Sequence, residues 1–445
     1  MEKISRQFYN YLGAYILIAL SGCLGNVVDG IIVGNLISGD GVSAINLSKP
    51  IVQFIFTLHL LINAGAGMRV GYALGRQDVV EARRYFTRAL VLSTGIGVLL
   101  SIFGGLLYTS EVANLLCSNA QIRPLAYDYM KVLMLGNPAF ILMWGLSTMV
   151  GVDGKPRLVS LAVIVDNVVN LCLDIVFIQG FGWGITGSSA ATIVGHFVGI
   201  AILLTHWWLP SDVTNGNNPL SRRLTPTFAS DKVLVTWEHI ASQGAPLAIA
   251  SISLTLLMLS ANTIVLSTLG RTGIFAFSVC MNLLQIYNLF TSGTCQTLQS
   301  LGAIQVGARN EEGLRVILRK AFRFITVSMV ITCIVVWLFP EAIARLFGAD
   351  EAGMLIESRR ALRIFALSFI PFCYIYVLMI VYKLYGQHTM SLFISFALSL
   401  TVIPVLWFIS RHYPEQLWYS YLIAYLIEAV AIFLLHRAKH VVFKL

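Results

Sequence analysis

Polar side chains recur inside apolar stretches of this sequence, at spacings that would bring them together. Asp166, Asn170 and Asp174 lie four residues apart in VDNVVNLCLD, so a helix would place them on one face. Asp29 lies in GCLGNVVDGIIVG, and Thr192 lies in SAATIV. At about 1.5 Å per residue, all of these except Asp166 would lie at one level of three helices. The pattern predicts a cluster of two carboxylates, an amide and a hydroxyl.

A cluster of oxygen ligands of this kind suits a hard cation such as sodium. Two carboxylates close together also favour a shared proton, because both cannot ionise cheaply where the dielectric constant is low. The alternative is that these groups only hold helices together through hydrogen bonds. The residue types therefore leave a sodium site, a proton site and a structural role open.

The composition indicates that the elements carrying these residues cross a membrane. Of the 445 residues, 57% are hydrophobic and 11% are charged, whereas about 25% charged is ordinary for a soluble domain. These values exclude a soluble enzyme and a disordered chain. The seven cysteines form no CxxC pair, which excludes a disulfide framework and a zinc cluster. The net charge of +9 is typical of the cytoplasmic loops of a membrane protein rather than of nucleic-acid binding.

The expected fold class is an all-α polytopic membrane protein with twelve transmembrane helices, because about 20 apolar residues are needed per span. A polar segment at 210–237, rich in proline and turn residues, predicts a cytoplasmic linker between a six-helix bundle at 1–209 and another at 238–445. The twelve apolar stretches are residues 11–37, 44–74, 85–107, 122–150, 158–180, 185–209, 239–269, 274–306, 321–347, 361–385, 390–410 and 417–435.

The two halves of the sequence repeat each other. Gly75 in YALGRQD corresponds to Gly307 in VGARN, and Gly154 in VDGKP corresponds to Gly386 in LYGQH, each 232 residues later. Six spans return the chain to the same side of a membrane, so the repeats are parallel and related by a pseudo-two-fold axis along its normal. Such repeats are known in transporters, with the substrate site between the halves. Lys and Arg gather in segments on the side of the N-terminus, which predicts that both termini are cytoplasmic.

Several motifs together resemble the multidrug and toxic compound extrusion (MATE) family. They are VDGIIVGNLISGDGVSAINLSKPI, GYALGRQDVVEA with its echo VGARNEEG, NVVNLCLDIVFIQGFGWGITGSSAAT, and GVDGKPR. The resemblance covers all twelve stretches. It implies two six-helix bundles around a central cleft, and export of compounds in exchange for sodium or protons. It also implies a cation-coupling site in the first half, which falls by motif on Asp29, Asn170, Asp174 and Thr192.

The sequence departs from the family pattern in two places. Many members have a proline about four turns before the first-helix aspartate, linked to bending of that helix, and this sequence has Ala14 there. Some members also use acidic residues in helices seven and ten, but residues 251–267 and 362–384 contain none. Proton-driven bending of helix one and a second cation site in the second half are therefore not expected. Glu428 is the remaining acidic candidate there.

A second set of residues is predicted to line a promiscuous substrate cleft, because aromatic and methionine side chains suit varied apolar cations. Packing or contact with lipid is the alternative for each of them. Lys49 and Arg69, in the second stretch, could bind an anionic substrate or pair with Asp29, or could extend toward water. The predicted cleft residues are Trp144, Met258, Met281, Gln285, Asn288, Tyr374 and Glu428.

We therefore predict an efflux transporter of the inner (cytoplasmic) membrane that exchanges small amphipathic or cationic organic compounds for Na+ or H+ by alternating access. It would act as a monomer in the lipid bilayer, bind no nucleic acid and need no cofactor beyond the coupling ion. A lipid-linked glycan flippase of the same superfamily is the rival within the transporter class, with Lys49 and Arg69 as its cationic hints. A membrane enzyme or a channel would need catalytic acids or pore-lining residues in both halves. No Walker, HExxH or GxSxG motif is present, so we expect no enzyme.

Overall fold

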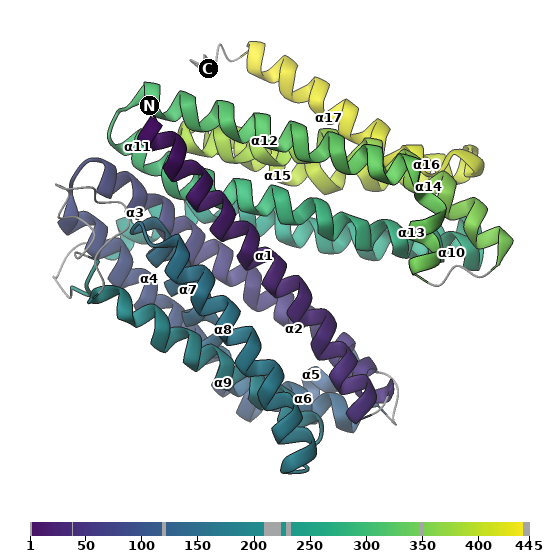
Figure 1. Cartoon of the computed structure of the whole chain (residues 1–445), viewed down its shortest axis with the longest axis horizontal. Helices are drawn as coiled ribbons and strands as arrows, with labels where there is room; N and C mark the ends of the chain where they lie inside the picture. The colour runs from purple at the N-terminus through teal and green to yellow at the C-terminus, as the bar shows by residue number, and fades with distance from the viewer. Residues whose placement is uncertain are drawn as a thin grey trace. The chain divides into compact units, whose positions relative to one another are not determined.

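A computed structural model describes residues 2–37, 39–117, 122–208, 224–227, 233–347 and 351–438. Every regular element in these ranges is helical (Figure 1). Helices are favoured because lipid offers no partners to backbone amides and carbonyls, and a helix pairs them internally. The chain divides into two compact units: the N-lobe, Tyr9–Ala245 with Ala303–Arg309, and the C-lobe, Met1–Phe8, Pro246–Gly302 and Asn310–Leu445. The predicted linker at 210–237 lies largely outside the described residues.

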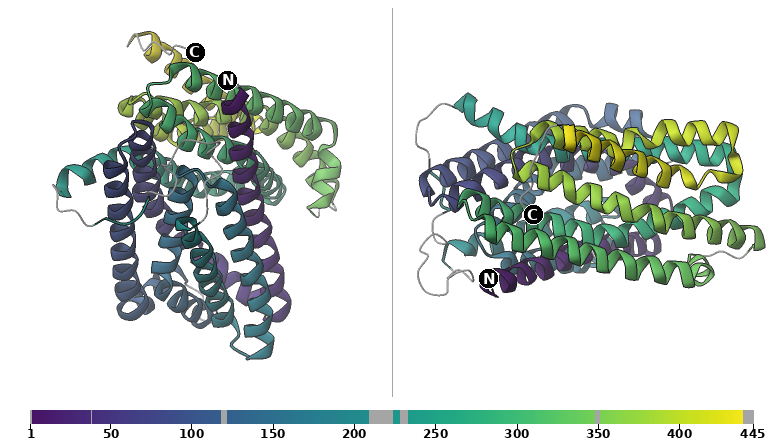
Figure 2. Two further views of the ribbon diagram at one scale, coloured as in Figure 1. Left: turned by 60° about the vertical axis from the view of Figure 1, so that its left-hand side comes forward. Right: turned by 90° about the horizontal axis from the view of Figure 1, so that it is seen from above.

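The N-lobe contains most of α1 and the helices up to the start of α10. In it, long helices lie side by side along a common direction (Figures 1 and 2). Its elements are α1 Glu2–Leu36, α2 Gly39–His59, α3 Gly65–Gly75, α4 Val79–Leu100, α5 Thr109–Leu116, α6 Arg123–Leu135, α7 Asn137–Val152, α8 Pro156–Ile175 and α9 Ile185–Leu204, with α11 Ala303–Gly307 packed on α3. Short π-helical segments at Leu60–Ala64, Ser101–Leu107 and Val176–Gly180 extend α2, α4 and α8.

The C-lobe repeats this arrangement with fewer, longer helices. Its elements are the greater part of α10 Val233–Thr297, then α12 Glu311–Leu338, α13 Pro340–Leu346, α14 Ala352–Leu384, α15 His388–Leu400, α16 Val402–His412 and α17 Tyr419–Ala438. The 65 residues of α10 would extend about 98 Å as one straight helix, about three times the hydrocarbon thickness of a bilayer. The backbone leaves the helical region at Gly270 (φ 63°, ψ −149°), a conformation open to glycine. We therefore count α10 as two spans that meet at Gly270.

The number of spans agrees with the sequence-based prediction. Within the described residues, ten helices are long and apolar enough to cross a membrane, or eleven when the bent pair α6–α7 counts as one span. Dividing the stretch Trp237–Gly307 at Gly270 brings the total to twelve. The prediction of an all-α polytopic membrane protein is therefore confirmed.

Several predicted boundaries were wrong. Helix α1 begins at Glu2, about two and a half turns before the apolar stretch, and the two spans of α10 meet at Gly270, inside the predicted gap at 270–273. The stretch 122–150 bends by 53° between α6 and α7, where Pro138 has no amide hydrogen for the Met134 carbonyl. The stretch 390–410 is interrupted at Thr401, where Pro404 leaves the Leu400 carbonyl without its helical donor.

The backbone confirms the repeat of 232 residues. Gly154 (φ 94°) and Gly386 (φ 72°) both have positive φ, as do Gln77 (φ 62°) and its counterpart Arg309 (φ 52°). The next residues in each half cap a helix in the same way. The Asp78 side chain accepts a hydrogen bond from the Glu81 amide at the start of α4, and the Asn310 side chain accepts one from the Gly313 amide at the start of α12.

Candidate cation-coupling site

Small residues on α9 bring it close to α8 in the N-lobe. A Cβ atom on Gly195 would lie 2.6 Å from Asp166 Oδ1 and 2.8 Å from the Asp166 carbonyl oxygen, and one on Gly199 would lie 3.3 Å from Asp166 Cβ. Such close approach through small residues is typical of helix pairs in membranes. The polar face predicted for residues 166–174 therefore lies directly against the SSAATIVGH sequence of α9.

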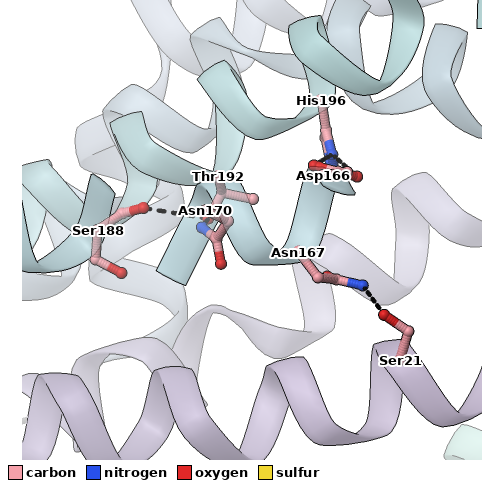
Figure 3. Close-up of polar contacts among 7 residues, drawn as sticks. All are labelled: Ser21, Asp166, Asn167, Asn170, Ser188, Thr192 and His196. Atoms are coloured by element: carbon pink, nitrogen blue, oxygen red, sulfur yellow. Dashed lines mark hydrogen bonds and ion pairs between the residues drawn. The ribbon is translucent and has the colours of Figure 1, made fainter. Parts of the chain in front are cut away.

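Asn170 and Thr192 pair across this interface, as Figure 3 shows. The Asn170 side-chain amide donates to Thr192 Oγ1 at 2.9 Å, and Thr192 Oγ1 donates to the Ser188 carbonyl oxygen at 3.1 Å. Both side chains are half-buried. Within the described residues no hydrogen bond to the Asn170 amide oxygen is seen, so this oxygen could accept a further donor or a cation.

The two predicted carboxylates lie on the same side of the lobe. Asp29, on α1, accepts a hydrogen bond from Ser188 Oγ at 3.4 Å, and its carboxyl group interacts with that of Asp174 on α8. The Asp174 side chain is fully buried (0% exposed). Neither of its oxygens makes a well-formed hydrogen bond within the described residues. The structure thus brings Asp29 to Asp174 and Asn170 to Thr192, and Ser188 contacts both pairs.

Sequence reasoning missed Ser188. It lies four residues before Thr192, on the same face of α9, and this spacing is the signal that could have identified it. A second missed contact joins α1 to α8, where the Asn167 amide donates to Ser21 Oγ at 2.9 Å (Figure 3). A third is the pair of Asp166 and His196, one helical turn from Asn170 and Thr192.

The predicted cleft residues are divided between the two lobes. Trp144 is half-buried in the N-lobe and contacts the rings of Phe56, His59 and Phe140. The other six lie in the C-lobe, and among the described residues no hydrogen bond or ring contact joins two of them. There, Met258 and Gln285 are exposed, Met281, Asn288 and Tyr374 are half-buried, and Glu428 is buried.

Tyr374 and Glu428 differ from the other C-lobe candidates in their surroundings. Tyr374 lines a groove of about 490 Å³ between α14 and α17, whose wall is otherwise apolar, and its hydroxyl pairs with Thr326. Glu428 is 1% exposed, and neither of its carboxylate oxygens has a hydrogen-bond partner within the described residues. Of the two cations in the second predicted stretch, Lys49 is exposed, and Arg69 donates to the His239 carbonyl oxygen at 3.4 Å.

Known proteins with similar sequences and folds are membrane transporters. The MatE family model matches residues 15–176 and 246–408. Multidrug export protein MepA of Staphylococcus aureus is 24% identical over 336 residues, which cover 74% of this chain and 72% of the relative. A solved structure of a MOP superfamily transporter from Pyrococcus furiosus is similar with a TM-score of 0.85 at 19% identity, over 98% of this chain and 96% of the other. A mutant of the Vibrio cholerae MATE transporter VcmN has a TM-score of 0.86 at 18% identity, over 99% and 98%.

The two matched segments, one in each half, together span most of the chain, and they follow the same repeat that the backbone landmarks show. Transporters rather than enzymes carry this family model, and the twelve spans described above agree with it. The chain is a multi-pass membrane protein that belongs to the MatE family, the multidrug and toxic compound extrusion efflux transporters.

Proposed function

We propose that this transporter exports small amphipathic or cationic organic compounds in exchange for Na+ or H+ by alternating access. The names of its relatives, multidrug export proteins, support the first part and do not favour the flippase alternative. The absence of a nucleotide-binding motif from the sequence supports an ion gradient as the source of energy. We further propose that it acts as a monomer in the inner membrane with both termini in the cytoplasm.

The observation that carries the coupling proposal is the contact between Asp29 and Asp174. Asp174 is fully buried without a well-formed hydrogen bond among the described residues, and its carboxyl group interacts with that of Asp29. Two carboxylates in a site with little water repel each other unless a cation or a proton lies between them. A transported cation satisfies both, and its departure on one side of the membrane leaves a charge imbalance that favours a different conformation.

Na+ is the slightly favoured coupling ion. Asn170, four residues before Asp174, and its hydrogen-bond partner Thr192 add neutral oxygen atoms, and a hard cation uses such ligands, whereas a proton needs only one carboxylate and a neighbour. At the position in α1 where many family members have a proline, this chain has Ala14. This also favours Na+, because that proline is linked to proton-driven bending of the helix. A proton at the Asp29–Asp174 pair is the alternative coupling ion, because a shared proton would also relieve the repulsion.

Export of a fluorescent lipophilic cation from liposomes that contain the purified protein tests this proposal. Na+ and pH gradients should be imposed separately on the wild type, Asp29→Asn and Thr192→Val. We expect Asp29→Asn to lose export under both gradients while remaining folded and inserted, because the removed carboxylate holds the coupling ion. Export at the wild-type rate by Asp29→Asn would refute the site.

The same experiment separates the two ions. If Na+ is coupled, Thr192→Val should lose about 90% of Na+-driven export, because a missing ligand is not easily replaced in a dry site. Full export by the wild type on a pH gradient without Na+, matched by Thr192→Val, would instead identify Asp29 and Asp174 as a proton site.

A further inference from the structure

The N-lobe contains a second buried ionisable pair that the proposed coupling mechanism does not use. His196 Nδ1, on α9, lies 2.9 and 3.1 Å from the two carboxylate oxygens of Asp166, on α8 (Figure 3). Asp166 is 5% exposed and His196 is 9% exposed. The pair is therefore an imidazole hydrogen-bonded to a carboxylate, in a buried part of the lobe where a charge is costly to desolvate.

The other ring nitrogen of His196 is free to take a proton. Within the described residues, Nε2 is buried and has no hydrogen-bond partner. With Nδ1–H donated to Asp166, Nε2 carries a lone pair, and this is the arrangement of a neutral imidazole ready for protonation. The Phe140 ring stands perpendicular to the imidazole at 4.3 Å and covers one side of it.

Other charged groups lie away from the pair on each element packed against α8 and α9. Helix α7, which contacts both, contains no acidic, basic or histidine residue between Asn137 and Val152. Helix α6 carries charges only at Arg123, Asp128 and Lys131, of which the last two are exposed and the first donates to the Cys117 carbonyl.

The remaining charges lie on α1, on α8 itself and beyond the end of α9. Asp174 lies eight residues further along α8, about 12 Å away, and Asp29 faces Asp174 rather than this pair. Arg157, at the start of α8, is exposed and donates to Asn10 Oδ1 on α1. His206 lies ten residues beyond His196, and its Nδ1 is hydrogen-bonded to the Leu203 carbonyl. Asp166 is thus the charged partner of His196 within the described residues.

The pair changes its net charge when it takes a proton. With a neutral imidazole it carries −1, and with an imidazolium it carries zero. Asn170 follows Asp166 by four residues on α8, and Thr192 precedes His196 by four on α9, so the pair lies one helical turn from the Asn170–Thr192 hydrogen bond. A cation held near that bond is attracted by a pair of charge −1 and is not attracted by a neutral one.

We propose that Asp166 and His196 form a proton-binding site, separate from the oxygen ligands, and that a proton there and a sodium ion at the oxygen site exclude each other through charge. The inference rests on the proposed function, because it needs the cation site to bind Na+. It gives the transporter a means of exchanging the two ions without shared ligands. Because linkage is reciprocal, Na+ must release the proton from His196 by the same factor as the proton weakens Na+ binding.

Nitrogen-15 NMR of the full-length protein in lipid nanodiscs, labelled at histidine, tests the inference. His196→Gln assigns the signal of His196, and exposed His412 serves as the internal control. The signals are followed from pH 5 to pH 9 with NaCl and with choline chloride at equal ionic strength. We expect His196 to change from neutral to doubly protonated in this range, and Na+ to lower the midpoint by about one pH unit, a tenfold coupling, while the midpoint of His412 does not move.

Two results would overturn the inference. One is a His196 imidazole that keeps one protonation state throughout the range, and the other is a midpoint that Na+ leaves unchanged. Asp166→Asn provides the matched variant, since losing the carboxylate should move protonation of His196 to lower pH while the amide still accepts a hydrogen bond. These measurements need no transport, so failure of the export experiment on Asp29→Asn is distinguishable from failure here.

Transport adds a readout that a merely structural pair would not change. In liposomes, His196→Gln should retain Na+-driven export but lose the part of its pH dependence that the wild type shows below about pH 7. A uniform reduction of the rate at every pH would indicate that His196 only supports the packing of α9, and would contradict the proposal.

Discussion

The α8–α9 pair of the N-lobe and its counterparts in the C-lobe, α15–α16 and α17, follow the same backbone turn but bury different side chains. Gly154 precedes α8, and Gly386 precedes α15, each with positive φ. Yet the residues 232 positions after Asp166, Asn170, Asp174 and Thr192 are Leu398, Val402, Leu406 and Ala424, and all four are fully or almost fully buried apolar side chains.

This difference teaches that the repeated backbone provides the shape of each lobe and does not determine the chemistry inside it. The C-lobe packs the interface with apolar contacts, whereas the N-lobe places ionisable groups at the same register, at a cost in desolvation. The exception is Glu428, which occupies the position that corresponds to His196, while Leu398 occupies the position that corresponds to Asp166. Substitutions that make the two lobes more alike therefore test where coupling lies.

The largest effect is expected when Asp174 is replaced by the residue of its counterpart, Leu406. Asp174→Leu should reduce gradient-driven export by more than about 100-fold, because it removes the buried carboxylate while filling the same space with a side chain that suits an apolar interface. Export of the fluorescent cation from liposomes is the measurement. Leu406→Met, a swap that conserves volume at the C-lobe position, should export normally. Normal export by Asp174→Leu would contradict the proposal that ion coupling depends on the ionisable groups of the N-lobe.

A smaller effect is expected on stability from Gly195→Ala. The new Cβ would meet both the side chain and the backbone of Asp166 at less than 3 Å, so α8 and α9 must separate, at a cost of about 1–3 kcal/mol. Thermal unfolding in detergent measures it. Gly95→Ala, on exposed α4 surface with open space around the new atom, should be neutral or slightly stabilising because alanine favours helix. Equal melting temperatures for the two variants would show that the interface is looser than described.

Glu428→Gln should have little effect on export or stability, in contrast to the large effect expected at Asp174. The carboxylate has no hydrogen-bond partner among the described residues, so an amide of the same shape removes an ionisable group without breaking a bond. We expect export within about twofold of the wild type and equal or higher thermal stability at pH 8. Loss of export comparable to that of Asp174→Leu would place a second coupling group in the C-lobe and remove the asymmetry.

The smallest effect is expected in the loop between α7 and α8. Asp153 and Lys155 lie there, and the corresponding residues of the C-lobe are neutral. Burial raises the pKa of Asp153 well above its usual value of 3.8, although nearby Lys155 opposes the shift. A carboxyl group whose pKa is raised by folding stabilises the fold at low pH, and this contribution is lost as the pH rises through the folded-state pKa.

Asp153→Asn removes this dependence on pH. Its melting temperature relative to the wild type should therefore increase as the pH is raised from about 4, which a series of thermal unfolding curves would show. Tyr385 occupies the C-lobe position that corresponds to Asp153, and Gln387 occupies the one that corresponds to Lys155, so the C-lobe turn has no matching charges. A difference between Asp153→Asn and wild type that is constant with pH would contradict the assignment.

Much of this organisation could be predicted from the sequence because helical periodicity fixes which residues share a face. The spacing of Asn170 and Asp174 and the depth of Asp29 were enough to group them. What could not be predicted is the register of one helix against another. Asp166 and His196 are each visible as ionisable residues in apolar surroundings, but their pairing depends on how closely Gly195 lets α9 approach α8.

The substrate-cleft predictions were less informative for a related reason. Methionine, aromatic and amide side chains suit a binding surface and a packed interior equally well, so their type does not say which way a helix is turned. Met258 is exposed while Tyr374 lines a groove. The gap predicted at 270–273 did mark the end of one span and the start of the next, because the backbone leaves the helical region at Gly270.

The close contact at Gly195 and Gly199 has a mechanical consequence. Asp166 backbone and side-chain atoms fill the space beside Gly195, and Met143 with Asp166 Cβ fills the space beside Gly199. Sliding of α8 along α9 by part of a turn would therefore cause a collision, so we expect the two helices to move as one rigid unit. Any bending that accompanies transport should then fall at the ends of this rigid unit, and the turn at Gly154, where φ is 94°, is one of these ends.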